Sequence, residues 1–281
     1  MKAGKPSATA KLIAAATILL SADRRTSSLV PPDAAGLSQA LLDLTPGGSL
    51  LGWSARNSVT RRLWRLVERL THPGIIAHYW HRKHWIELQC REAVAAGFSR
   101  VLVIGAGFDT LAWRLARERD DLELVEIDHP ATQAAKARAM TGMQVKLVPL
   151  DLAASAIPDA VQRSDKATII ILEGLLMYLE PEVVEQLLRS LHGMAAAEVH
   201  LVFSYMTRWP DGSIGFRPRS ALVDRWLSWR AEPFAWAMES AVMSDFLARM
   251  GFRVVASTSG SSLSATESQL EGENLVACRR A

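Results

Sequence analysis

The fold is decided by VLVIGAGFDT, residues 101–110, in which four apolar residues run directly into a Gly-Ala-Gly turn. An apolar run of this length fits a buried strand. The turn lets the backbone approach a ligand closely, because glycine has no side chain and tolerates unusual dihedral angles. A helix is expected to follow from about Asp109 to Arg119. This order of strand, turn and helix is typical of a parallel sheet wound with crossover helices.

Downstream of this segment, short apolar or β-branched runs alternate with helical stretches. The predicted strands are residues 101–104, 122–127, 145–148, 168–172, 199–205, 252–256 and 274–278. The predicted helices are residues 109–119, 130–140, 181–197 and 244–250. We therefore predict a Rossmann-like α/β fold with a seven-stranded, mostly parallel sheet and helices on both faces.

The region before the first predicted strand has a different residue pattern. Residues 1–99 lack strand-like alternation and read as a helical N-terminal cap, with breaks near Pro31, Pro46 and Pro73. Residues 100–281 are assigned to the sheet domain, and residues 206–243 to a lid insertion after its fifth strand. A chain of 281 residues with 49% hydrophobic content buries one sizeable core, so we expect one structural unit overall.

Charge and cysteine content exclude some classes of function. A net charge of +3 with a pI near 9.0 does not by itself call for a nucleic-acid partner. Cys90 and Cys278 are too few for a disulfide framework and lack the spacing of a zinc site. We therefore expect a reducing, cytoplasmic setting, no metal and no membrane partner.

The N-terminal segment leaves one alternative open. Lys2, Lys5 and Lys11 precede an apolar run at residues 12–20, as in a short secretory signal. The run reads equally well as a helix packed on the body of the protein, and no clear cleavage site follows it. We favour the packed helix.

A second basic segment lies in the cap. Five arginines, Arg56, Arg61, Arg62, Arg65 and Arg69, are interleaved with Leu63, Trp64, Leu66, Val67 and Leu70. This pattern predicts an amphipathic helix whose arginines form the solvated face. RNA binding is the alternative, but no RNA-binding motif accompanies the arginines.

Acidic residues follow three successive predicted strands. Asp128 follows the second strand, Asp151 the third and Glu173 the fourth. Open α/β sheets bind ligands at the edge formed by the carboxyl ends of their strands, where Asp128 could accept hydrogen bonds from both ribose hydroxyls of a nucleoside. The competing interpretation makes Asp128 the N-cap of a helix that begins at Pro130.

The glycine turn also raises the possibility of a dinucleotide. The Gly-x-Gly-x-x-Gly pattern fails, because Thr110 stands where the third glycine should be. Asp109 places a carboxylate where a pyrophosphate would sit, whereas a cationic sulfonium would be tolerated there. A turn that binds nothing is the remaining alternative.

In these residues, the chain resembles the leucine carboxyl methyltransferase family, including its bacterial polyketide O-methyltransferase-like branch. Four blocks from about Tyr79 to Leu191 carry the resemblance. They are VLVIGAGFDT at 101–110, EIDHP at 126–130 with Lys136, Asp151-Leu152, and EGLLMYL at 173–179. The resemblance implies a class I methyltransferase fold and S-adenosylmethionine as the co-substrate.

The resemblance also implies roles for individual residues. Gly105, Ala106 and Gly107, with Asp109, would line the methionine part of the donor; Asp128 would hold the ribose, Asp151 and Leu152 would border the adenine, and Glu173 would lie near the amino group. Arg82 falls where the family places an arginine that pairs with the donor's carboxylate, a group that an arginine grips with two parallel hydrogen bonds. A solvated charge on the helical cap is the alternative for Arg82.

The acceptor is less well defined by the sequence. We predict an O-methyltransferase acting on a carboxylate or hydroxyl of a small metabolite, with Tyr178, Arg208 and Trp209 as candidates near the acceptor and no residue assigned as catalytic. Aromatic residues and arginines in the insertion suit a flat anionic or aromatic molecule. They are Trp209, Phe216, Trp226, Trp229, Phe234 and Trp236, with Arg208, Arg217, Arg219, Arg225 and Arg230.

Three alternatives remain open: a protein C-terminal carboxyl methyltransferase, an NAD-dependent oxidoreductase and a non-catalytic S-adenosylmethionine-binding protein. The histidines near the predicted pocket do not decide among them, because a lone histidine is more often structural than catalytic. The sequence does not fix the oligomeric state.

Overall fold

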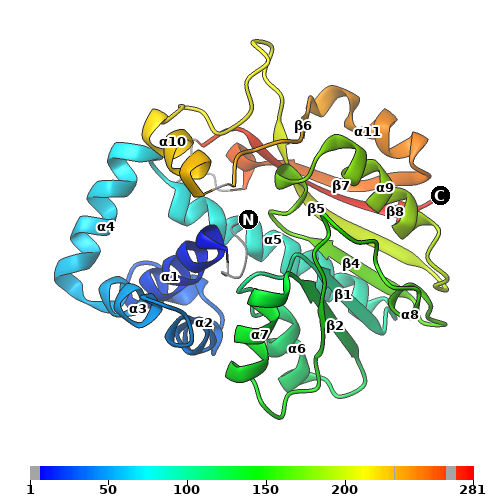
Figure 1. The fold of residues 1–281 in the computed structure, drawn as a ribbon, viewed down its shortest axis with the longest axis horizontal. Coiled ribbons are helices and arrows are strands. Elements are labelled where there is room, and N and C mark those ends of the chain that lie inside the picture. The colour runs from blue at the N-terminus through cyan, green and yellow to red at the C-terminus, as the bar shows by residue number, and fades with distance from the viewer. Residues whose placement is uncertain (1–6, 231, 264–269) are drawn as a thin grey trace.

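One mixed sheet forms the centre of the computed structural model, which describes residues 7–230, 232–263 and 270–281 (Figure 1). Its strands are β1 (Arg100–Ile104), β2 (Glu123–Asp128), β3 (Lys146–Pro149), β4 (Thr168–Leu172), β5 (Val199–Thr207), β6 (Ala237–Met238), β7 (Phe252–Ser259) and β8 (Glu273–Arg280). Seven of them correspond to the predicted strands. The additional strand, β6, has two residues and pairs in parallel with Met206 and Thr207 at the end of β5.

The strand order is β3-β2-β1-β4-β5-β8-β7, with β6 beside β5. Pairing is parallel throughout except around β8, which runs antiparallel to both β5 and β7. The predicted Rossmann-like α/β class with a mostly parallel sheet is therefore confirmed. Because β1 lies between β2 and β4, the glycine turn after β1 lies between the acidic residues that follow its two neighbours.

Helices surround the sheet in the order set by the chain. They are α1 (Ala8–Ala22), α2 (Ala34–Asp43), α3 (Gly48–Arg56), α4 (Ser58–Thr71), α5 (Ile75–Ala95), α6 (Leu111–Glu118), α7 (Pro130–Ala139), α8 (Asp159–Gln162), α9 (Pro181–His192), α10 (Ala221–Arg230) and α11 (Ser240–Arg249). Three short 3-10 helices, η1 (Ser27–Leu29), η2 (Leu176–Tyr178) and η3 (Gly260–Ser262), connect them.

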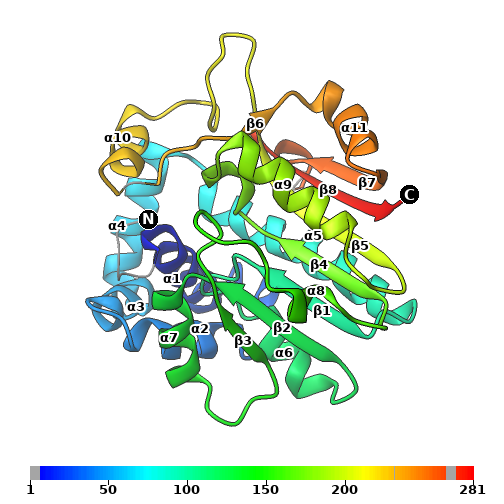
Figure 2. The ribbon, with the colours of Figure 1, turned by 45° about the vertical axis from the view of Figure 1, so that its right-hand side comes forward.

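Alternation along the strands divides the core into two layers. Val101 and Val103 of β1 point into the cluster that contains α1, α2, α5, α6 and α7. Leu102 and Ile104, which alternate with these valines along the strand, point into the cluster that contains α8, α9 and α11. Since successive side chains of a strand face opposite sides of a sheet, a continuous apolar run is what a strand covered on both faces requires. Figures 1 and 2 show the two layers of helices.

The N-terminal apolar run lies inside helix α1, in which every residue from Ala14 to Leu20 is buried. The predicted packing of this segment on the body is therefore confirmed for the described residues. Lys2 and Lys5 lie outside the described residues. All five N-terminal helices precede β1; the division into a cap and a domain stays a prediction.

The orientation of helix α4 agrees with our prediction only in part, because Arg62 and Arg69 are exposed as expected but the leucines do not pack. We expected its arginines to face solvent and its leucines to pack, but Leu63, Leu66 and Leu70 are exposed. Arg61 instead reaches the carbonyl of Ala22, with Nη1 and the oxygen 2.6 Å apart. The prediction was wrong because alternation of charge and apolar residues identifies the two faces of a helix, but not which face meets the protein.

Two helix boundaries also differ from the prediction. Helix α9 ends at His192 rather than at residue 197, with Gly193 as its C-cap, and the N–H of Met194 then donates to the carbonyl of Leu191 instead of continuing the helical pattern. Helix α11 begins at Ser240, four residues earlier than predicted. Within the insertion at 206–243, α10 and β6 form elements that the sequence analysis did not specify.

Candidate functional site

A cavity of about 610 Å³ opens at the carboxyl edge of the sheet. Its walls include the glycine turn after β1, the residues that follow β2, β3 and β4, and parts of α1, α5 and the segment at 232–235. Its volume falls within the range of small-molecule sites. Every residue predicted to bind the donor lines this cavity: Arg82, Gly105, Ala106, Gly107, Asp109, Asp128, Asp151, Leu152 and Glu173.

The glycine turn needs glycine for two separate reasons. Gly105 has φ +71° and Gly107 has φ +48°, a region that residues with a side chain adopt at a cost. A Cβ placed on Gly105 would also lie 2.9 Å from Cδ1 of Leu175, which follows β4. The turn is therefore tight both in its backbone and against the neighbouring loop, and it presents bare backbone to the cavity.

Replacing Gly105 with alanine is expected to destabilise the protein by about 2–4 kcal/mol, combining left-handed backbone strain with overpacking. Gly47 is a matched control, because its φ is also +71° but no atom lies within 4 Å of its would-be Cβ. Urea unfolding of Gly105→Ala and Gly47→Ala measures the difference. Equal losses of free energy of unfolding in the two variants would refute the role of Leu175.

Asp128 is held by backbone on both sides of its carboxylate. Oδ2 accepts from the N–H of Gly107 at 2.7 Å, and Oδ1 accepts from the N–H of His129 at 2.7 Å. The side chain of His129, not of Asp128, caps α7 by accepting from the N–H of Ala131. The interpretation of Asp128 as an N-cap is therefore wrong. Each carboxylate oxygen keeps a lone pair that could accept a hydroxyl hydrogen from a ligand.

Asp151 and Leu152 follow β3 at the far side of the cavity. The Asp151 side chain accepts from the N–H of Ala153 and is exposed, so it is less constrained than Asp128. The order across the sheet edge is therefore Asp151, Asp128, the Gly105 turn and Glu173, following the strand order β3-β2-β1-β4. Four strand ends thus converge on a single cavity.

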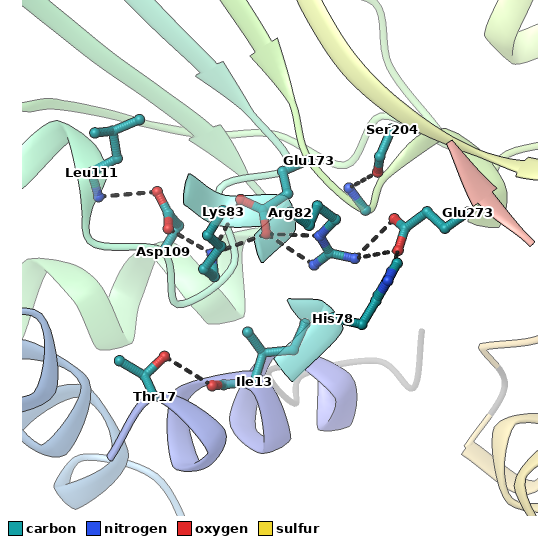
Figure 3. Close-up of polar contacts among 11 residues, drawn as sticks. Ile13, Thr17, His78, Arg82, Lys83, Asp109, Leu111, Glu173, Ser204 and Glu273 are labelled. Atoms are coloured by element: carbon teal, nitrogen blue, oxygen red, sulfur yellow. Dashed lines mark hydrogen bonds and ion pairs between the residues drawn. The ribbon is translucent and has the colours of Figure 1, made fainter. Parts of the chain in front are cut away.

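Arg82 of α5 lies between two glutamates (Figure 3). Its Nη2 lies 2.9 Å from Oε1 of Glu173, and its Nη1 lies 2.9 Å from Oε1 of Glu273. The arginine and Glu273 are almost completely buried, whereas Glu173 borders the cavity. The interpretation of Arg82 as a solvated surface charge is therefore wrong. Its pairing with a donor carboxylate stays a prediction, since two protein carboxylates already occupy its guanidinium.

This arrangement shifts the pKa of Glu273. Burial raises the pKa, but the charge of Arg82 and the hydrogen bond from His78 outweigh burial and lower it to about 2. The Nε2 of His78 lies 2.7 Å from Oε2 of Glu273, and both side chains are buried. Glu273 is thus a fixed anion at neutral pH that holds Arg82 in place.

Lys83 connects the network to the glycine turn. Its Nζ lies 2.7 Å from Oδ1 of Asp109 and 3.0 Å from Oε1 of Glu173. Asp109 also accepts from the N–H of Leu111 at the start of α6. Burial raises the pKa of Asp109, but the charge of Lys83 and its hydrogen bond lower this pKa by more than burial raises it, so the net shift is downward. Because Lys83 neutralises the charge of Asp109, this carboxylate would repel a pyrophosphate less than we expected.

Another part of the cavity wall is aromatic. The ring centroids of Tyr178 and Phe234 lie 5.7 Å apart, and those of Phe216 and Phe234 lie 6.5 Å apart. Tyr79 and Met177 complete this wall. Burial raises the pKa of the Tyr178 hydroxyl far above its ordinary value, so the phenol stays protonated at neutral pH. Tyr178 can therefore donate a hydrogen bond but cannot serve as a base.

Arg208 and Trp209, our other candidates near the acceptor, do not line the cavity. They begin a loop that projects away from the body after β5 (Figure 2). Arg217 stacks on the ring of Trp209 with its Cζ 4.1 Å from the centroid, and Trp209 Nε1 donates to the carbonyl of Gly215. The loop thus provides partners for the Trp209 side chain, and a role for Arg208 and Trp209 near the acceptor finds no support in this cavity.

Several residues of the site escaped the sequence analysis. Lys83 is adjacent to Arg82 and could have been nominated, whereas Glu273 is 191 residues from its partner and gives no local signal. Glu232 accepts from the hydroxyl of Thr9 at 2.6 Å and from the N–H of Ala8 at 3.1 Å. These bonds bring the N-terminus of α1 to the segment after α10, across one side of the cavity.

Two further observations concern the described residues as a whole. Among them, no group of three or more histidine, cysteine, aspartate or glutamate side chains is arranged to hold a metal ion. None of the helices that the structure describes is both long and apolar enough to cross a bilayer.

Solved structures resemble this chain in fold. The crystal structure of a "putative methyltransferase" from Thermobifida fusca matches 99% of this chain and 96% of its own, with a TM-score of 0.57 and 16% identity. The pyocyanin biosynthetic protein PhzM matches 92% of this chain and 77% of its own, with a TM-score of 0.50 and 16% identity. At this identity the likeness concerns the fold alone.

Sequence relatives are more specific. Proteins of Mycobacterium tuberculosis and Mycolicibacterium smegmatis, both named "Putative S-adenosyl-L-methionine-dependent methyltransferase", are 27% identical over 186 residues and 30% identical over 145 residues. The alignments cover 59% and 48% of this chain, and 52% and 46% of the relatives, so the chain spans about half their length. A family model described as leucine carboxyl methyltransferase matches residues 20–192, which is more than half of the chain. This chain therefore belongs to the leucine carboxyl methyltransferase family.

Proposed function

We propose that this protein is an S-adenosylmethionine-dependent O-methyltransferase. The observation that carries the proposal is the convergence of Asp151, Asp128, the Gly105 turn and Glu173 on one cavity, in a chain of the leucine carboxyl methyltransferase family. Bound there, S-adenosylmethionine supplies a methyl group that its sulfonium already activates for displacement. The protein is left to position the reactants and to exclude water.

The cavity residues suit the parts of such a donor. Asp128 offers acceptors for two ribose hydroxyls, and Asp151 with Leu152 would border the adenine one strand further along the sheet. Glu173 would attract the donor's amino group. Arg82 and Lys83 both contact Glu173, so they would lie close to the donor's carboxylate and could pair with it. The negative charge of Glu173 beside the positive charges of Arg82 and Lys83 suits the donor's amino-acid group, which is zwitterionic.

An NAD-dependent oxidoreductase is the competing enzyme. An acidic residue after β2 would serve a dinucleotide as well, so Asp128 does not discriminate between the two. The classic dinucleotide-binding sheet is parallel with order 3-2-1-4-5-6, whereas here the antiparallel β8 is inserted between β5 and β7. This insertion, with Thr110 in place of the third glycine, favours the methyltransferase.

For the acceptor we propose a flat aromatic molecule with a hydroxyl or carboxyl group. The aromatic wall of Tyr79, Tyr178, Phe216 and Phe234 supports this choice. The anionic acceptor that we expected has less support, because Arg208, Arg217, Arg219 and Arg225 do not line the cavity. The lining carries Asp109, Asp128, Asp151, Glu173, Glu180, Glu232 and Glu273 against Arg82 and Lys83. A polyketide-like acceptor and a protein C-terminal carboxylate are finer alternatives within the same reaction.

Calorimetric titration of S-adenosylmethionine and, separately, of NAD into the full chain tests the proposal. We expect the donor to bind and NAD not to bind. Transfer of a labelled methyl group to a panel of aromatic alcohols and carboxylic acids, with S-adenosylhomocysteine as the second readout, then identifies the acceptor class. Absence of donor binding by folded protein would sink the proposal; donor binding without turnover on any acceptor would favour the non-catalytic alternative.

A further inference from the structure

Helix α4 exposes a continuous apolar stripe. Val59, Leu63, Leu66, Val67 and Leu70 have exposed fractions of 72%, 59%, 48%, 50% and 70%. Their spacing of three, four and seven residues places them on one face of the helix. A stripe of five large aliphatic side chains is unusual on the surface of a monomeric protein, where apolar patches of this kind mark interaction sites.

The orientation of α4 is fixed by contacts on its opposite face. The carboxylate of Glu68 is buried and accepts from the N–H of Ile76 at 3.0 Å. Trp64 Nε1 donates to the hydroxyl of Ser54, and Arg61 Nη1 donates to the carbonyl of Ala22. Because these polar contacts anchor one face, the exposed apolar stripe lies on the face directed away from the body. Helix α4 itself lies at the edge of the molecule (Figure 1).

Positive charge accompanies the stripe. Arg62 and Arg69 lie one turn before and one turn after Leu66, both are exposed, and neither has an ion pair with another described residue. The only acidic residue between 48 and 71 is Glu68, which is buried. The exposed surface of α3 and α4 therefore combines apolar and cationic groups without exposed carboxylates.

The adjoining helix adds to this surface. Leu50 and Trp53 of α3 are exposed to 69% and 55%. Tryptophan is enriched at the interface between membrane and water, where its amphipathic ring is accommodated. Leucine, valine and tryptophan beside arginine make up the composition of helices that lie in the plane of an anionic membrane surface.

A second copy of this chain fits the stripe less well. In a two-fold antiparallel pair of α4 helices, the same edge of each helix lies on the same side of the interface. Arg62 and Arg69 of both copies would then face one another, and no exposed carboxylate of α3 or α4 would compensate them. An anionic lipid surface satisfies both the apolar stripe and its cationic edge.

We propose that the apolar stripe of α4, with Arg62 and Arg69 along its edge, docks this protein on an anionic lipid surface. The helix would lie in the interface, its aliphatic side chains among the acyl chains and its arginines at the headgroups. The contact would be peripheral and reversible, and it does not depend on the proposed methyl transfer.

Co-sedimentation of the full chain with vesicles tests the proposal. We expect binding to an equimolar mixture of phosphatidylcholine and phosphatidylglycerol, little binding to phosphatidylcholine alone, and release at high salt. The double variant Arg62→Gln and Arg69→Gln is expected to bind about 25-fold more weakly. The variant Leu63→Gln and Leu70→Gln is expected to lose about tenfold or more.

A matched control carries Leu88→Gln and Val242→Gln, which change exposed apolar residues outside α3 and α4. It should bind within about twofold of wild type. Equal binding to neutral and anionic vesicles, or binding unaffected by the α4 variants, would overturn the proposal. Dimerisation of the wild type in ultracentrifugation that Leu63→Gln and Leu70→Gln abolish would also overturn it, in favour of a second copy as the occupant.

Discussion

Replacing Asp128 with alanine is expected to weaken S-adenosylmethionine binding by at least about 100-fold. Hydrogen bonds to a charged acceptor contribute about 1.5–3 kcal/mol each, and removal of Asp128 strips the partner from two ribose hydroxyls. The same change removes the acceptor of the Gly107 and His129 N–H groups. The variant therefore loses both a ligand contact and a support of the glycine turn. Calorimetric titration of the donor into wild type and Asp128→Ala measures the effect.

The control for this prediction lies near the opposite end of the same strand. Asp121 precedes β2, is exposed, and pairs only with Arg119 among the described residues. Asp121→Ala removes the same chemical group from the surface and should leave donor binding within about twofold. Thermal unfolding of both variants separates a loss of affinity from a loss of fold. Unchanged donor binding by a folded Asp128→Ala variant would contradict the ribose role.

The parts of the fold predicted from sequence are those with a local signal. Strand β4 coincides with the predicted residues 168–172, because a buried parallel strand is a continuous apolar run that needs no further information. Strand β6 was missed, because its two residues become a strand only by pairing with Met206 and Thr207 of β5. A strand of that kind is a property of the assembled sheet and not of its own sequence.

Helix α4 shows a different limit of sequence reasoning. Its periodicity is plain, but which face packs depends on partners elsewhere in the chain. Arg61 and Arg65 turn inward because Ala22 offers a carbonyl and Asp23 a carboxylate. Neither partner is visible from the helix itself. A pattern of two faces therefore predicted the helix and the exposure of Arg62 and Arg69 correctly, but it predicted the burial of the leucines wrongly.

The residues of the site that lie at the ends of strands could be predicted from the sequence. Asp128 and Glu173 lie at the ends of recognisable strands, and parallel strands bring their carboxyl ends to one edge. The partners of Arg82 were not predictable in the same way. Glu273 begins the antiparallel β8, and only that strand's position beside β5 brings it to α5. Long-range pairing of this kind leaves no pattern in the sequence near either residue.

Arg82→Leu is expected to destabilise the protein by about 3–5 kcal/mol, because it removes the cation that lies between two glutamates. Glu273 carries most of this cost, since it is almost completely buried, whereas Glu173 keeps Lys83 and borders the cavity. The midpoint of thermal unfolding should fall by about 10 °C for a chain of this size. Arg91→Leu is the matched control: Arg91 and Glu118 are 39% and 46% exposed, and Glu87 keeps Arg114, so the loss should stay below about 1 kcal/mol.

The deficit of Arg82→Leu should depend on pH in a defined direction. In the wild type the pKa of Glu273 is lowered from 4.5 to about 2, so its charged form stabilises the fold above about pH 4.5, and this contribution is lost as the pH falls toward 2. In the variant, burial without Arg82 favours the protonated carboxyl, so the folded protein gains stability relative to the unfolded chain as the pH falls. The difference between variant and wild type should therefore shrink from pH 7 toward pH 4.5.

A double-mutant cycle with Glu273→Gln separates this electrostatic cost from lost packing. If the uncompensated carboxylate causes the destabilisation, the variant with both Arg82→Leu and Glu273→Gln should regain about 1–3 kcal/mol over Arg82→Leu alone at pH 7, because it buries no orphaned charge. The regained stability should vanish near pH 4.5, where the glutamate of the single variant is itself protonated. A deficit that is the same at every pH and is not relieved by Glu273→Gln would show that Arg82 stabilises the fold by packing rather than by pairing.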